Sequence, residues 1–507
     1  MRASLFRPGP DFTDPTPLVV TAHLALWRRV AASVKGLCLV PLLSGCVLTA
    51  ENPELGLDIP PAYQAAAATD AYASPPTLDW WGSFRSRELT DLMQQAQEAN
   101  LDIAAAIARV TQADASARVT GAALLPTVDF NSSVSRSGSG APTQDNVSGF
   151  TSLRRDQTNY SASLSAGYEI DFWGKNRASL RAAQENAIAA RYAQDVVSIT
   201  VLASAANSYF QILAAQDRLE IAQRNLSSAL RVLDLIKQRL AVGTASELDT
   251  AQQESLVANV RANLPTLEQV LRQNKATLAV LVGKTPEAVT IKGGSLYRLA
   301  IPRITPGLPS DLLIQRPDIR QAEAALAAGS ANVYVARTQF LPSIQLSAEG
   351  GYQSTVLRTL FTPQSQFYQL AAGLTQPIFQ GGALIGNLEQ QKGRQIELLQ
   401  QYRLAILSGL ADVENALVAV QQMARREQLQ RDVVNSSRRA FDIAETRLRE
   451  GTVDLVTTLQ TQQTLFQAED SLANVRLARM LAVVSLYQAL GGGWTRTPLT
   501  RTASPLQ

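Results

Sequence analysis

The chain has 507 residues, of which 46% are hydrophobic and 18% are charged, and its formal net charge is +3 at pH 7. This composition supplies enough apolar material for a large core and is unlike that of disordered chains. The nearly balanced charge, with basic residues dispersed along the chain, excludes the concentrated basic surface of a nucleic-acid-binding protein.

The first expected element is a secretory leader over residues 1–45. Basic side chains come before its apolar run: Arg28, Arg29 and Lys35. The run itself, residues 36–45, is shorter than the roughly 20 residues of a transmembrane helix, and this arrangement is typical of a signal peptide. Leu43-Ser44-Gly45-Cys46 resembles a bacterial lipobox. We therefore expect an N-acyl group and a diacylglycerol lipid on Cys46, whereas an incidental buried cysteine is the alternative.

Removal of the leader has two consequences. Val47 follows Cys46, and the absence of Asp at that position implies outer-membrane sorting in such lipoproteins, where several acyl chains give a firm anchor. The second cysteine, Cys38, and the only histidine, His23, both lie in the leader. Ser-His-Asp and Cys-His catalysis, histidine metal sites and cysteine-bound zinc are thereby excluded after cleavage. We expect no enzyme, no metal and no cofactor, although chemistry by carboxylates alone stays open.

The rest of the chain is predicted to be an internal duplication. Paired motifs recur 216 residues apart: Asp102-Ile103 with Asp318-Ile319, and Leu125-Pro126 with Leu341-Pro342. This period is far longer than that of a solenoid repeat. After an anchor and equatorial segment over 46–84, we expect one repeat at 85–290 and another at 316–493, each with helix, strand, strand, long helix and helix. A linker at 291–315 joins them, and a tail at 494–507 follows.

Four segments have the alternation of β-strands. Residues 159–172 alternate strictly between apolar and polar side chains, residues 343–352 and 368–378 do so in the second repeat, and residues 128–134 do so more weakly. A half-buried soluble sheet alternates in the same way. The leader favours a barrel in lipid, where a sheet must close on itself. Four strands are too few for one chain, so several copies must combine their strands, and three copies would give twelve.

Two long helical hairpins are predicted. Residues 175–242 and the matching tract of the second repeat are rich in helix-forming residues, and about 70 residues of helix would span roughly 100 Å. Gly243-Thr244 and Gly451-Thr452 each follow such a tract, and glycine ends helices well, so each marks a hairpin tip. Pro265 is expected to interrupt and bend the first return helix near Leu264. A straight packed bundle is the alternative to a tube.

Trp80, Trp81 and Phe84 are expected to be packing anchors rather than a functional surface. More specific are four ordered stretches: Leu308-Pro309-Ser310-Asp311-Leu312-Leu313 with Arg316-Pro317-Asp318-Ile319, Tyr168-Glu169-Ile170-Asp171-Phe172-Trp173-Gly174, Gln376-Pro377-Ile378-Phe379 with Gly381-Gly382, and Ala489-Leu490-Gly491-Gly492-Gly493-Trp494. In these stretches the chain resembles the TolC and OprM outer-membrane efflux channels, particularly the lipoprotein branch that includes the nodulation-type, NodT-like proteins.

This resemblance implies a mixed, mainly α fold: a homotrimer with a 12-stranded transmembrane barrel continuous with a periplasmic helical barrel. It implies a passive channel in the outer membrane that a periplasmic adaptor protein connects to an inner-membrane pump, of the RND type. Six residues match the segments that meet the adaptor: Arg239, Gly243, Thr244, Arg447, Gly451 and Thr452.

The resemblance also points to the tunnel mouth, where related channels carry carboxylates. The matching positions here are Thr457 and Gln460, which puts an acidic gate in doubt. Asp249 and Asp454 lie near the tips, and we favour a solvated or helix-capping role for them over gating. The alternative function is a lipid-anchored periplasmic coiled-coil scaffold with a soluble sheet.

Overall fold

The computed structural model describes residues 56–65, 79–138, 156–304, 306–492 and 494. The expected leader and Cys46 lie outside these described residues, which all belong to one unit of the chain, residues 52–507. All structural statements below concern the described residues of this unit.

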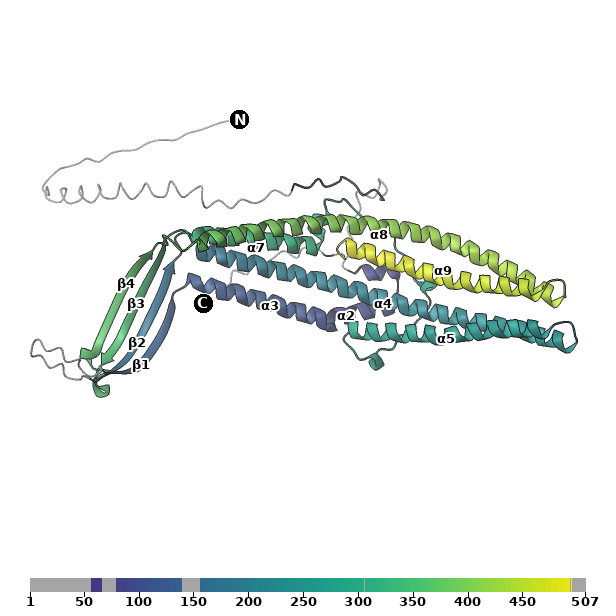
Figure 1. Cartoon of the computed structure of the whole chain (residues 1–507), viewed down its shortest axis with the longest axis horizontal. Coiled ribbons are helices and arrows are strands. Elements are labelled where there is room, and N and C mark those ends of the chain that lie inside the picture. The colour runs from purple at the N-terminus through teal and green to yellow at the C-terminus, as the bar shows by residue number, and fades with distance from the viewer. Residues whose placement is uncertain (1–55, 66–78, 139–155, 305, 493, 495–507) are drawn as a thin grey trace, which may run out of the picture. The chain divides into compact units, whose positions relative to one another are not determined.

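The elements of this unit repeat once in the same order (Figure 1). The first repeat contains η2 (Trp80–Phe84), α2 (Arg87–Ala99), α3 (Leu101–Gly121), β1 (Thr127–Ser137), β2 (Gln157–Ile170), α4 (Lys175–Ala241) and α5 (Glu247–Leu281). The second contains α6 (Leu312–Gln315), α7 (Pro317–Thr338), β3 (Ser343–Ser354), β4 (Gln366–Thr375), α8 (Ala383–Arg449) and α9 (Leu455–Ala489). Both long helices have 67 residues and both return helices have 35.

Three sequence expectations about these elements need correction. The first helix of repeat one is two helices, because the Asn100 side chain accepts hydrogen bonds from the amides of Asp102 and Ile103 and caps α3. Strand β2 ends at Ile170 and β4 at Thr375, each short of the predicted end. Pro265 does not interrupt α5. The helix continues past it because the ring of Pro265 faces outward, while partly buried Leu264 and buried Leu267 keep this part of the helix packed.

The four strands form one antiparallel sheet in the order β1-β2-β3-β4. The register aligns residues of one kind in rows, such as Val128, Ala166, Ala348 and Leu370. Since opposed residues point to the same side of a sheet, this row and its neighbours make one apolar face. Strands β1 and β4 are the two edges, and neither is paired along its outer side within the described chain.

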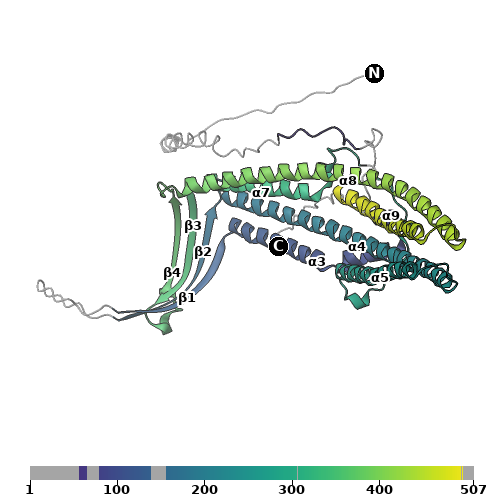
Figure 2. The ribbon, with the colours of Figure 1, turned by 45° about the vertical axis from the view of Figure 1, so that its right-hand side comes forward.

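The helices form a layer in the same order as the strands. Helix α3 packs on α4, α4 on α7, and α7 on α8, so α3 and α8 are the edges of this layer (Figures 1 and 2). Helix α5 lies along α4, α9 lies along α8, and α9 also contacts α4. One chain is therefore an open strip of strands continued by an open strip of helices.

An aromatic core fixes the middle of the helical part. The ring of Trp80 stacks on that of Tyr487 with centroids 4.9 Å apart, and the ring of Phe84 lies 5.0 Å from that of Phe210. Trp80, Trp81 and Phe84 are all buried in this cluster. Their predicted role as packing anchors is confirmed, since they tie the segment before α2 to helices α4 and α9.

Helix α8 leaves part of its apolar surface uncovered. Exposed apolar side chains recur every 11 residues along it: Ile385, Ile396, Leu407, Val418 and Leu429. Eleven residues make about three helical turns, so these side chains form one stripe nearly parallel to the helix axis. An 18-residue window of α8 is apolar enough to cross a bilayer by composition, and only 28% of it is buried. The stripe lies on the edge helix of an open layer, where a further copy would cover it.

Candidate functional site

The two faces of the sheet differ in chemistry. Along the apolar face Val128, Phe130 and Leu370 are each at least 66% exposed. The opposite face carries Ser, Asn, Gln, Asp and Glu, and its side chains bond across the strands. The Ser163 hydroxyl donates to Glu349 Oε1 (2.8 Å), and Asn131 Nδ2 donates to Ser165 Oγ (2.9 Å). An apolar outer face and a polar inner face are what a barrel in lipid requires.

The junction between sheet and helices is tightly bonded. Asp171 accepts hydrogen bonds from the backbone amides of Asn176 and Arg177, which satisfies amides at the start of α4 where no other cap is present. The indole of Trp173 donates to the carbonyl of Pro342 (2.7 Å). Phe379, in contrast, is 88% exposed beyond β4. The hydroxyl of Tyr334 on α7 donates to the carbonyl of Trp173 (3.0 Å). The junction thus gives a physical reason for the Tyr168–Gly174 motif, since its residues join β2 to α4 and α7.

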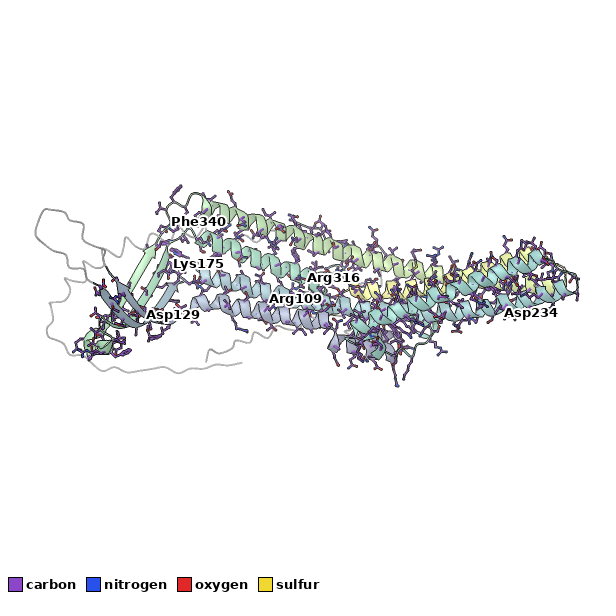
Figure 3. All side chains as sticks on the ribbon, turned by 60° about the horizontal axis from the view of Figure 1, so that its bottom comes forward. Arg109, Asp129, Lys175, Asp234, Arg316 and Phe340 are labelled. Carbon is purple, nitrogen blue, oxygen red and sulfur yellow. The ribbon has the colours of Figure 1, made fainter. Side chains whose placement is uncertain are left out.

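The linker motif is explained by a second network. The guanidinium of Arg316 donates to Asp318 on α7 (2.6 Å) and to Asp412 on α8 (3.0 Å), and also to the carbonyl of Ala489 at the end of α9 (3.2 Å). Its side chain is 11% exposed. These two carboxylates raise the pKa of Arg316 despite its burial, so it stays charged. Arg316 fastens three helices at the start of the second repeat (Figure 3).

The hairpin tips lie where the sequence places them, and their backbones match. The amide of Thr244 donates to the carbonyl of Arg239, and that of Thr452 donates to Arg447, both at 2.8 Å. Gly243 and Gly451 have φ of 74° and 75°, the left-handed conformation that ends a helix. The six predicted tip residues therefore belong to two equivalent turns. Docking of an adaptor on them stays a prediction.

The two acidic residues near the tips are helix caps. Asp249 accepts from the amide and the hydroxyl of Ser246 in a capping box at the start of α5. Asp454 accepts from the amide of Thr457 (2.8 Å) at the start of α9, and its contacts with Thr457 lower the pKa of Asp454. Gln460 is exposed on α9. These bonds agree with the preferred capping role, while a part in the tunnel mouth stays a prediction.

Polar contacts link the two hairpins at several levels along their length. Near the middle of the helices, Arg218 on α4 forms a two-pronged ion pair with Asp470 on α9 (2.7 and 3.2 Å). Further toward the tips, buried Gln253 on α5 lies 3.4 Å from Gln462 on α9. At the tips, Arg239 Nη1 donates to the carbonyl of Leu448 at the end of α8 (2.6 Å). The first hairpin thus provides a cap for a helix of the second.

A buried charge cluster between α8 and α9 was missed by sequence reasoning. The carboxylate of Glu427, 1% exposed, receives the guanidinium groups of Arg431, Arg476 and Arg479 at 2.6 to 3.0 Å. Arg476 also donates to the carbonyls of Leu296 and Leu299. Burial raises the pKa of Glu427, but the three arginines outweigh it and lower that pKa overall. The cluster joins both helices to the segment that precedes repeat two.

These features define a class of protein: an outer-membrane channel in which strands and helices of several copies close together. The chain matches the Outer membrane efflux protein family over residues 92–284 and 308–492, and it belongs to that family.

Relatives agree over nearly the full length. The chain is 42% identical over 472 residues to the pyoverdine export outer membrane protein OpmQ of Pseudomonas putida, covering 92% of this chain and 99% of the relative. It is 33% identical to the toluene efflux pump outer membrane protein TtgF of Pseudomonas putida, covering 83% and 88%. It is 29% identical to the cation efflux system protein CusC of Escherichia coli, covering 90% and 98%.

Solved structures share the fold. The outer-membrane channel OprN superposes with a TM-score of 0.82 at 26% identity, over 88% of this chain and 99% of that one. The open MtrE outer membrane channel of Neisseria gonorrhoeae gives a TM-score of 0.78 at 26% identity, over 88% and 98%.

These comparisons confirm the predicted fold and function. The chain is mainly helical and internally duplicated, and three copies form a 12-stranded transmembrane barrel continuous with a helical barrel. It is the outer-membrane channel of a tripartite efflux system, with an adaptor and an inner-membrane pump as partners, and it extends into the periplasm.

Proposed function

We propose that this channel is a lipid-anchored passive conduit that makes and breaks no bonds, with the pump choosing the cargo. The observation that carries this is the matching order of strands and helices, each an open strip with two free edges. Closing both strips with the same neighbours makes one continuous lumen. Related channels are named for the export of pyoverdine, toluene or cations. Because such different cargoes are named for channels of one family, this supports a choice of cargo by the pump.

The test is electrical. Purified trimers inserted into planar bilayers should show single-channel conductance without any energy source. Trimers that insert and conduct nothing would overturn the proposal, and so would a chain that is soluble and monomeric without detergent, which the scaffold alternative requires.

The lipid anchor on Cys46 is the second part of the proposal. Its support is the Leu43-Ser44-Gly45-Cys46 motif after an apolar run. Cells grown with labelled palmitate should incorporate the label into the wild-type chain and not into Cys46→Ala. Because the apolar sheet face is independent of the lipid, Cys46→Ala should still need detergent to stay in solution. A label that persists in the variant would contradict lipidation at this residue.

The partners are proposed in finer detail as well. We expect the pump to be of the RND type. We expect the adaptor to contact Gly243, Thr244, Gly451 and Thr452, because these residues form the exposed turns of both hairpins. Cysteines placed at Thr244 or Thr452 should form cross-links with the adaptor in cells. A cysteine at Gln401, exposed on α8 far from the tips, is the matched control and should form none.

A further inference from the structure

Two carboxylates lie in a single row on the polar face of the sheet. Asp129 of β1 is paired with Ser165 of β2, Ser165 with Glu349 of β3, and Glu349 with Gln369 of β4. Directly paired residues point to the same side, so both carboxylates belong to the face opposite Val128 and Phe130. Figure 3 shows Asp129 on the sheet. The row crosses all four strands from one edge to the other.

No basic side chain of the strands balances these charges. All residues of β1 to β4 are described, and their only Lys or Arg is Arg136. It has the parity of the apolar face and forms an ion pair with Asp156 near the outer end of β1. The third acidic residue of the polar face, Glu169, is paired with Lys175 at 2.5 Å. In the described chain, Asp129 and Glu349 form no ion pair with a basic group.

The trimer brings this charge together. With three copies, the row contributes six carboxylates to the lumen, two from each copy. The wall behind them is an apolar sheet face in lipid, and a low-dielectric wall concentrates the field of charges of one sign in the pore. Carboxylates around a lumen favour cations in transit over anions.

We infer that Asp129 and Glu349 make the barrel cation-selective for small ions. The inference rests on the proposed passive conduit. It assigns no bound ion to these residues, because they act through the field on ions that pass. The field reaches about 10 Å at 0.1 M salt and about 3 Å at 1 M, so the preference should weaken at high salt.

The experiment measures the reversal potential of wild-type trimers in planar bilayers between two KCl concentrations. The wild type should pass K⁺ in preference to Cl⁻ at low salt. The Asp129→Asn/Glu349→Gln double variant should lose this preference, and its permeability ratio should approach that of free KCl. Asp129→Glu, which retains the charge, should retain the preference.

The matched control removes equal charge elsewhere. Asp91 and Glu98 are exposed on α2, so Asp91→Asn/Glu98→Gln should leave the permeability ratio unchanged. Trimers without conductance would refute the proposed conduit, and the inference on selectivity would fail with it. Conducting trimers that lack cation preference, or a double variant that keeps it, would overturn the inference while the conduit stands. Trimer mass in detergent establishes that each variant is assembled before its selectivity is compared.

Discussion

At the scale of single residues, two glycines with the same left-handed backbone, Gly283 and Gly243, differ in the space around them. Gly283 ends α5 with φ of 68°, and the amide of Lys284 closes the turn on the carbonyl of Ala279 (2.9 Å). A Cβ added at Gly283 would lie 2.2 Å from the carbonyl oxygen of Ala99, which is backbone and cannot turn aside. At Gly243, with φ of 74°, a Cβ would meet nothing within 4 Å.

Gly283→Ala should therefore lower the melting temperature more than Gly243→Ala. Both variants carry the cost of a left-handed alanine, about 1 to 2 kcal/mol. Only Gly283→Ala must also displace the end of α2. Thermal unfolding followed by circular dichroism measures the difference, and equal melting temperatures for the two variants would show that the contact with Ala99 relaxes freely.

Glu427 should be among the most sensitive carboxylates for stability. Replacing it with Gln leaves three guanidinium groups without their common partner, and breaking a buried ion pair costs about 3 to 5 kcal/mol. Glu397, on the same helix, pairs with Arg394 while both side chains are about half exposed, so Glu397→Gln should cost under about 1 kcal/mol. Unfolding of both variants in denaturant gives the comparison.

The pH dependence of Glu427 follows from the sign of its pKa shift. The folded-state pKa of Glu427 is lowered, so its stabilising effect is present above the unfolded value of about 4.3 and is lost as the pH falls through the folded pKa. The wild type should lose stability below about pH 4.3, and Glu427→Gln should lose less over the same range. Parallel acid profiles would mean that other carboxylates dominate.

At the scale of whole elements, the sequence predicts features that follow from patterns along the chain better than it predicts contacts between distant residues. The strand parity and the tips at Gly243 and Gly451 could be predicted because each depends on nearby residues, and the duplication could be predicted because its motifs recur at one fixed spacing along the sequence. The break at Asn100 depends on a side-chain cap that the helix-forming composition hides. The Glu427 cluster could not be predicted, because two of its three arginines, Arg476 and Arg479, come from another helix and only the fold places them beside this carboxylate.

The stripe on α8 was missed although its signal is in the sequence. Apolar residues 11 positions apart, from Ile385 to Leu429, fit neither a seven-residue repeat nor the narrower spacing of a soluble amphipathic helix. A search at a period of 11 would have found them. Helix α3, at the other edge of the layer, also exposes apolar residues such as Leu101 and Val119. The two edges are therefore suited to meet between neighbouring copies.

Leu407→Lys should consequently weaken the trimer. The substitution places a charge at the centre of the stripe, where we expect the neighbouring copy to remove it from water. Gln401→Lys introduces the same charge six residues earlier, on an exposed part of α8 outside the stripe, and should leave assembly intact. Light scattering of the detergent-solubilised protein reports the mass. A stable Leu407→Lys trimer would exclude the stripe from the interface between copies.

At the scale of the whole molecule, one chain supplies one third of a channel that three copies complete. The sheet exposes its apolar face and both edges, and the helical layer does the same at α3 and α8. Lipid tolerates no unpaired sheet edge, so the barrel closes between copies and the helices continue that closure into the periplasm. We expect opening of the far end to depend on contacts within each chain that hold its two hairpins together.

The tip contact of Arg239 is the clearest of these because the duplication supplies its own control. Arg239 donates to the carbonyls of Leu448 (2.6 Å) and Thr244 (3.2 Å), whereas Arg447, its counterpart in the second hairpin, is exposed and donates no side-chain hydrogen bond in the described chain.

Arg239→Ala should raise the average conductance of trimers in planar bilayers, since separating the hairpins no longer breaks a charged hydrogen bond worth about 1 kcal/mol or more in each copy. Arg447→Ala should conduct like the wild type. Equal conductance for all three proteins would show that the tips are held by other contacts. A higher conductance for Arg447→Ala alone would mean that Arg447 restrains the second hairpin through a contact outside its own chain. The hydrogen bond from Arg239 to Leu448 would still be intact in that variant.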